Sequence, residues 1–205
     1  MDARGHGHAG LHARLHARIQ SRFGDMFEGD GADRYDEHHR RLRPIHTAVA
    51  RRAVALLPAG GRYLDIGTGP GALPALVAAA RPDVTVTGVD VSQRMVELAA
   101  ARLAVVTGAD RGRVVLGDAA ALPLPDGCAD LVTAVLTTHH WQHLAAGAAE
   151  LRRVTAPGGA VLIVEVRGPA RHVARTLRQA GFVVGRENAW AYALPFARLI
   201  ARVPA

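Results

Sequence analysis

The chain has 205 residues, of which 25 are basic and 18 acidic, so its formal net charge is +7. Every basic residue is arginine, and the absence of lysine excludes a Schiff-base lysine for pyridoxal phosphate and a Walker-type phosphate-binding lysine. Cys128 is the only cysteine, which excludes an internal disulfide and a structural zinc site built from cysteines.

The N-terminal part of the chain is expected to form a helical cap, residues 1–43, ahead of a main domain formed by residues 44–205. Apolar side chains recur along the cap at a helical spacing, at Leu11, Leu15, Ile19, Phe23 and Phe27. The segment 44–57 predicts a further helix, because Pro44 suits a first helical turn. Its apolar face comprises Val49, Ala53, Leu56 and Leu57.

From residue 62 onward, short apolar strands alternate with helices. The expected strands are 62–66, 84–89, 114–116, 130–136 and 160–166. The expected helices are 71–80, 92–103, 145–154 and 170–180, with Ser92 as a helix cap. Two final extended stretches, 182–187 and 199–203, have no helix between them, and residues 190–193 could lengthen the first. This order predicts an α/β fold: a Rossmann-like, doubly wound, seven-stranded sheet, mostly parallel with a C-terminal antiparallel strand.

A glycine-rich turn, Asp65-Ile66-Gly67-Thr68-Gly69-Pro70-Gly71, joins the first of these strands to its helix. Glycines there allow positive φ and let the backbone approach a ligand closely. Doubly wound sheets bind nucleotides at this edge. Gly67, Gly69 and Ala72 also satisfy the loose dinucleotide fingerprint, so the turn alone does not identify the ligand.

Three aspartates narrow the choice of ligand. Asp65, Asp90 and Asp118 stand at the ends of three successive strands. A carboxylate at Asp65 suits a ligand with ammonium and sulfonium groups and would repel a pyrophosphate. Asp90 could accept hydrogen bonds from ribose hydroxyls, and Asp118 from an adenine amine. The alternatives are a loop-bracing role for Asp65, a capping or surface role for Asp90 and a turn role for Asp118.

Four ordered segments, 63–71, 88–92, 117–124 and 153–159, resemble the motifs of class I S-adenosylmethionine-dependent methyltransferases, in the small-molecule branch. The resemblance spans roughly residues 44–166 and implies S-adenosyl-L-methionine as cofactor. It implies that Asp65, Gly67 and Gly69 hold the methionine moiety, Asp90 the ribose, and Asp118 with Ala119 the adenine. The other cofactor-binding residues that we expect are Tyr35, Thr68, Gly71, Val91 and Thr137.

The stretch Thr137-Thr138-His139-His140-Trp141 follows the fourth strand, where the resemblance implies proximity to the transferred methyl group. Histidine can act as a general base near neutral pH, so His140 and, after it, His139 are the catalytic candidates. The alternative is that these side chains shape the pocket. Glu165, near the end of the fifth strand, could reach the acceptor, but we expect it to be a solvated strand end.

The cap segment contains further candidates. Tyr35 resembles a tyrosine that closes over the cofactor in related proteins, with packing against helix 44–57 as the alternative. His8, His12 and His16 share one helical spacing, but no acid joins them, and we expect no metal site. Because no lid segment separates the fifth strand from the next helix, we expect residues 1–46 to form most of the roof over the acceptor.

These observations predict a methyltransferase acting on a small molecule through an O, N or C nucleophile. A non-catalytic S-adenosylmethionine-binding accessory protein and a nicotinamide-dependent oxidoreductase are the alternatives. The arginines are dispersed, so no nucleic-acid partner is expected, and no stretch reaches the roughly 18 apolar residues of a membrane span. Without an N-terminal apolar signal, a cytoplasmic location is expected. The sequence neither predicts nor excludes a homodimer.

Overall fold

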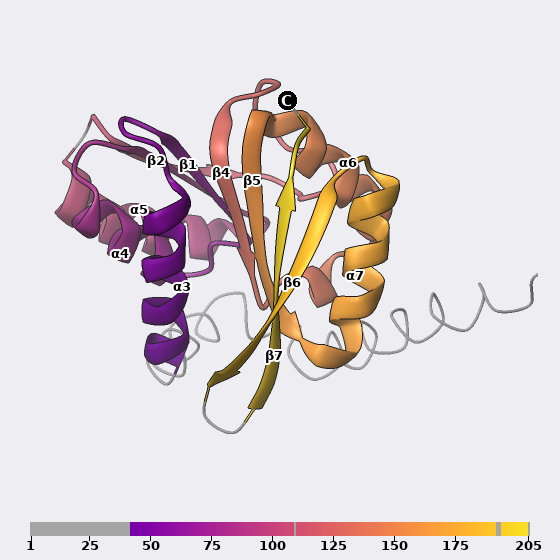
Figure 1. Ribbon diagram of the computed structural model, residues 1–205. Helices are drawn as coiled ribbons and strands as arrows, with labels where there is room; N and C mark the ends of the chain where they lie inside the picture. The colour runs from indigo at the N-terminus through magenta and orange to yellow at the C-terminus, as the bar shows by residue number, and fades with distance from the viewer. Residues whose placement is uncertain (1–41, 109, 192–193, 205) are drawn as a thin grey trace, which may run out of the picture.

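The computed structural model describes residues 42–108, 110–191 and 194–204. Its centre is a seven-stranded sheet with the strand order β3-β2-β1-β4-β5-β7-β6 (Figure 1). The strands are β1 Arg62–Ile66, β2 Thr85–Asp90, β3 Gly112–Leu116, β4 Ala129–Val135, β5 Thr155–Val166, β6 Val183–Ala191 and β7 Leu194–Arg202. Strands β1 to β5 pair in parallel, and β7 runs antiparallel to both β5 and β6. The predicted fold class is therefore confirmed.

Helices cover both faces of this sheet. The helices are α3 Arg43–Leu56, α4 Ala72–Ala80, α5 Gln93–Thr107, α6 Leu144–Val154 and α7 Arg167–Gln179, with a 3-10 turn, η3, at Thr138–His140. Helices α3, α4 and α5 lie on one side of the sheet and α6 and α7 on the other (Figure 1). Both faces of the sheet are therefore buried, as its nearly continuous apolar strands require.

Local chain chemistry sets several helix ends. Pro44 occupies the first turn of α3, as predicted. The Ser92 hydroxyl accepts a hydrogen bond from the Met95 amide at 3.3 Å, which confirms the predicted cap of α5. Gly71 precedes α4 with a φ of 79°, and a β-carbon there would collide with Ala99 of α5. Close packing of α4 against α5 thus depends on this glycine.

Several boundaries differ from the sequence prediction. Strand β7 begins at Leu194, five residues before the predicted stretch, and pairs along its whole length with β6. Helix α7 begins at Arg167, directly after β5, so the short connection expected between them forms its first turn. Strand β7 is extended by its pairing with β5 and β6, which the local sequence does not reveal.

Residues 1–41 of the predicted cap segment lie outside the described residues, and with them the candidates Tyr35, His8, His12 and His16. Of the predicted roof, residues 1–46, the structure describes residues 42–46, which include the first turn of helix α3. In the described part of the chain, no helix combines the length and the apolar character needed to cross a bilayer.

Candidate cofactor-binding site

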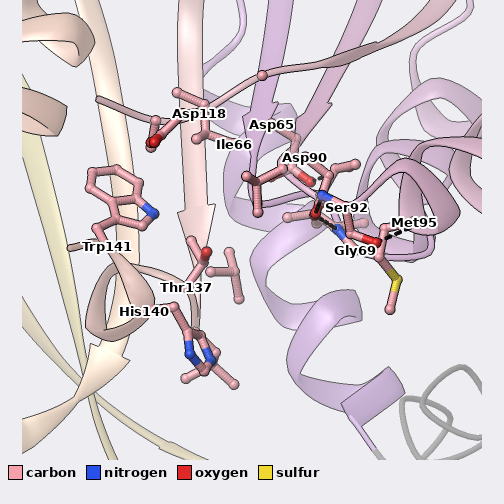
Figure 2. Close-up of a pocket in the computed structure, with 18 of the residues that line it drawn as sticks. Asp65, Ile66, Gly69, Asp90, Ser92, Met95, Asp118, Thr137, His140 and Trp141 are labelled. Atoms are coloured by element: carbon pink, nitrogen blue, oxygen red, sulfur yellow. Dashed lines mark hydrogen bonds between the residues drawn. The ribbon is translucent and has the colours of Figure 1, made fainter. Parts of the chain in front are cut away.

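A cavity of about 220 Å³ opens where β1, β2 and β4 end and where the segment after β3 begins. It contains Asp65, Asp90 and Asp118, so the three carboxylates predicted from successive strand ends do meet at one site. Figure 2 shows Asp90, Gly69 and Met95 on one side of the cavity and Thr137, His140 and Trp141 on the other. The sheet edge therefore presents acids to one part of a ligand and a mixed polar and aromatic wall to another.

The glycine turn forms the floor of the cavity. Gly67 and Gly69 have φ angles of 66° and 52°, in the left-handed region that favours glycine. A β-carbon on Gly67 would overlap the Thr137 side chain, and one on Gly88 would press on Thr68. The backbone of the turn therefore packs against Thr137 on one side, where a larger residue would not fit. Its other side lines the cavity.

Asp65 is 3% exposed and is braced by two hydroxyl groups. Its carboxylate accepts hydrogen bonds from Thr133 Oγ1 and, at 2.9 Å, from Thr68 Oγ1 within the glycine turn. Burial raises the pKa of Asp65 from 3.8 to about 7, against the opposing effect of these two bonds. Asp65 therefore both braces the turn and lines the cavity, so the bracing and ligand-binding roles are compatible.

Asp90 connects β2 to the glycine turn. One carboxylate oxygen accepts from the Gly69 amide at 2.8 Å and the other from the Ser92 amide at 3.0 Å. Burial raises the pKa of Asp90, and these amides act in the opposite direction. Asp90 also lines the cavity, and because a carboxylate has about four lone pairs, it keeps capacity to accept from a hydroxyl donor.

Asp118 follows β3 and begins a short turn. Its Oδ1 accepts from the Ala120 amide at 2.8 Å, and its backbone bridges to Ala121. The turn holds Asp118 and Ala119 at the cavity rim. Trp141, which is 8% exposed, also lines the cavity, and Figure 2 shows its indole facing Asp118.

The wall after β4 carries backbone strain. Leu136 has a φ of 53°, and it is the one non-glycine residue with positive φ in the described part of the chain. Such a conformation costs of order 1–2 kcal/mol for a residue with a β-carbon. Leu136, Thr137 and His140 all line the cavity. Strain retained at this point is typical of a functional site.

Glu165 is not a solvated strand end, as we expected, but is 0% exposed. It accepts hydrogen bonds from Thr138 Oγ1 at 2.6 Å and from His139 Nδ1 at 2.9 Å. The prediction was wrong because η3 and the neighbouring elements cover the end of β5. The ring of His139 is thereby directed to Glu165, whereas that of His140 lines the cavity.

Two lining residues that were not predicted as site residues are Leu42, at the N-cap position of α3, and His46 within that helix. His46 is 5% exposed, and its burial, followed by the repulsion of Arg102, lowers its pKa from 6.5 to about 4. His46 is therefore neutral at physiological pH. Its spacing from Val49 and Ala53 places His46 on the apolar face of α3. This spacing is the sequence signal that could have identified it as a buried residue.

The predicted cofactor-binding residues that line the cavity are Asp65, Gly67, Thr68, Gly69, Asp90, Val91, Asp118, Ala119 and Thr137, and His140 of the catalytic pair lines it too. Gly71 and His139 are not among the lining residues. The lining residues that the sequence analysis did not name as site residues include Met95, Trp141, Gln142 and Leu73. Met95 and Leu73 belong to helices packed behind the turn, and only the tertiary arrangement brings them to the cavity.

Comparison with known proteins agrees with this geometry. Residues 64–163 match a family model described as a methyltransferase domain. A demethylmenaquinone methyltransferase from Thermus thermophilus is 37% identical over 143 residues, which are 68% of this chain and 64% of that protein. A 27-O-demethylrifamycin SV methyltransferase from Amycolatopsis mediterranei is 36% identical over 127 residues, or 61% of this chain and 46% of that protein.

The fold is shared with solved structures. A SAM-dependent methyltransferase from Aquifex aeolicus superposes with a TM-score of 0.70 at 23% identity, covering 86% of this chain and 98% of that one. The present chain spans only 46% to 64% of the length of the two curated relatives described above.

Proposed function

We propose that this chain, which belongs to the class I S-adenosylmethionine-dependent methyltransferases, transfers a methyl group from this cofactor to a small-molecule acceptor. The observation that supports the proposal is the meeting of Asp65, Asp90 and Asp118 beside a glycine turn in one cavity. Both curated relatives described above have names that denote small-molecule acceptors, a quinone and a rifamycin.

The donors and acceptors in the cavity fit the cofactor. Asp65 offers a carboxylate to its ammonium group, Asp90 offers two oxygens to the ribose hydroxyls, and Asp118 offers an oxygen to the adenine amine. The carboxylates of Asp90 and Asp118, and that of Asp65 when it is ionised, would repel the phosphates of a dinucleotide. The charge of the cavity therefore favours a positively charged nucleoside over the nicotinamide cofactors.

When bound, S-adenosylmethionine supplies a methyl group activated by a sulfonium. The chain's part is to align the acceptor and to exclude water. Leu136, Thr137, His140 and Trp141 line the side of the cavity after β4, and we assign the acceptor to this side. His140 would take the proton from a hydroxyl acceptor, a step that a carbon or nitrogen nucleophile does not always need.

The test has two stages. Calorimetric titration with S-adenosylhomocysteine should show one site per chain, while NADH at the same concentration should give no heat of binding. A panel of phenols, hydroquinones and amines is then offered with radiolabelled cofactor, and transfer of label to one class identifies the acceptor atom. Cofactor binding without transfer to any acceptor would instead support the accessory-protein alternative.

A further inference from the structure

A buried carboxylate lies behind the wall that we assign to the acceptor. Glu165 is fully buried near the end of β5 and accepts from two consecutive residues of η3. Thr138 Oγ1 donates to it at 2.6 Å, and His139 donates through both its ring and, at 3.3 Å, its backbone amide. The backbone amide of Val166 also donates to the Glu165 carboxylate, at 2.8 Å.

These donors keep Glu165 ionised. Burial would raise its pKa, but the hydrogen bond from His139, the charge of that ring and the hydroxyl of Thr138 outweigh burial, and the net shift is downward. A buried carboxylate that loses its partners is costly, because water cannot replace them. The fold therefore favours the one position of η3 in which Thr138 and His139 both reach Glu165.

The ring contact of His139 also determines which nitrogen carries its proton. An ionised carboxylate only accepts hydrogen bonds, so the His139 Nδ1, 2.9 Å from Oε1 and 3.0 Å from Oε2, must be protonated. A carboxylate that receives the Nδ1–H of a histidine fixes both the tautomer and the ring orientation. His139 is 14% exposed and therefore has little freedom to turn elsewhere.

His139 transmits this position to the cavity. Its ring centroid lies 4.2 Å from that of His140, with a tilt of 43° between the two planes. His140 lines the cavity, and His139 does not. The chain of contacts thus runs from Glu165 to His139 and from there to the ring that faces the ligand space.

We infer that Glu165 and His139 form a positioning pair, which holds the His140 ring at the acceptor side of the cavity and itself takes no proton from the acceptor. His139 and His140, which were both candidates for the general base, thus have different roles: His139 positions, and His140 faces the acceptor. This assignment rests on the proposed function only in calling this side of the cavity the acceptor side.

Two variants of His139 separate positioning from proton transfer. The side-chain amide of asparagine lies close to the place of Nδ1, whereas that of glutamine reaches the place of Nε2. H139N therefore keeps a donor to Glu165 and loses the outer nitrogen, and H139Q does the reverse. E165Q keeps the shape of the carboxylate and removes its charge.

The experiment records ring-nitrogen NMR spectra of ¹⁵N-histidine-labelled protein with and without S-adenosylhomocysteine, at about pH 6 and about pH 8. We expect His139 to keep its proton on Nδ1 under all four conditions. In E165Q it should shift to the Nε2–H tautomer, and the His140 signals should move. Both His139 variants lose the ring that contacts His140, but only H139N keeps a donor to Glu165, so H139N should displace the His140 signals less than H139Q does.

The inference is overturned if wild-type His139 carries its proton on Nε2 alone, or if E165Q leaves both rings unchanged. If E165Q does not fold, as judged by circular dichroism, the comparison of H139N with H139Q still decides. H143A, at an exposed histidine next to α6, controls for loss of an imidazole. Failure of wild-type protein to bind S-adenosylhomocysteine would refute the proposed function, while the His139 tautomer could still be read in the ligand-free protein.

Discussion

The Asp90 carboxylate accepts a hydrogen bond from the Gly69 amide at 2.8 Å, across 21 residues of chain. This bond ties the end of β2 to the glycine turn after β1. The same side chain also lines the cavity, so the residue that would receive the ribose also holds the turn that would receive the methionine moiety. We therefore expect ligand binding and loop geometry to be coupled at Asp90.

Replacing Asp90 should weaken cofactor binding more than it weakens the fold. We expect D90A to lower the affinity for S-adenosylhomocysteine by about 10- to 100-fold, the equivalent of one or two charge-assisted hydrogen bonds. Calorimetric titration measures the change. D126A removes an exposed carboxylate remote from the cavity and serves as the control. Wild-type affinity in D90A would leave Asp90 with only a bracing role.

Gly67 and Gly60 are a matched pair for testing whether the glycine turn must pack closely against Thr137. Both have positive φ, at 66° and 63°, so an alanine costs each about 1 kcal/mol or more in backbone strain. A β-carbon at Gly67 would also overlap Thr137, whereas one at Gly60 meets nothing within 4 Å. G67A should therefore lose cofactor affinity and stability well beyond G60A. Equal urea-unfolding midpoints and equal affinities would contradict the packing argument.

The raised pKa of Asp65 makes part of the stability depend on pH. The native carboxyl keeps its proton up to about pH 7, but in the unfolded chain it loses the proton near pH 3.8. The native state therefore binds more protons between these values, and stability falls as pH rises through this window. Relative to D65N, the free energy of unfolding of the ligand-free wild type should fall by roughly 1.4 kcal/mol per pH unit. Urea unfolding at pH 5, 6 and 7 tests this, and parallel profiles would count against the shift.

His46 should give the opposite trend. Its pKa is lowered to about 4 in the fold, whereas in the unfolded chain it takes up a proton near 6.5. Stability therefore falls as pH drops from 6.5 towards 4, because the unfolded state binds more protons there. The glutamine of H46Q stays neutral. As the pH falls from 6.5 towards 4, the free energy of unfolding of H46Q should therefore increase relative to the wild type by roughly 1.4 kcal/mol per pH unit. Unfolding free energies that differ by a constant amount across the window would refute this.

His140 should affect turnover and leave cofactor affinity largely intact. With a hydroxyl acceptor identified by the proposed screen, H140A should lower kcat by about 10²- to 10⁴-fold, the usual contribution of a positioned base. S-adenosylhomocysteine affinity should stay near the wild-type value, since Asp65 and Asp90 remain. H143A is the control for this variant too. Full turnover by H140A would remove the base role and leave His140 as part of the pocket wall.

The sequence by itself determined the order of the elements and the position of the candidate cofactor site along the chain. Apolar strands that alternate with helices predict the parallel sheet. Once a strand has been located in the sequence, the residues at its end can be named as well. Asp65, Asp90 and Asp118 could therefore be placed at one edge, because parallel strands share the edge at which they end. The glycine turn is equally local, since its positive φ angles are a property of the residues themselves.

Only the tertiary structure decided what covers each strand end. Nothing in the residues around Glu165 shows that η3 folds over it, or that His139 turns towards it while His140 faces the cavity. His46 likewise reaches the cavity through the packing of α3 against α4. Burial and hydrogen-bond partners arise between segments far apart in the chain, and the pKa of a buried group follows from them. A periodic pattern identifies the face on which a residue lies, but the element packed against that face determines its chemistry.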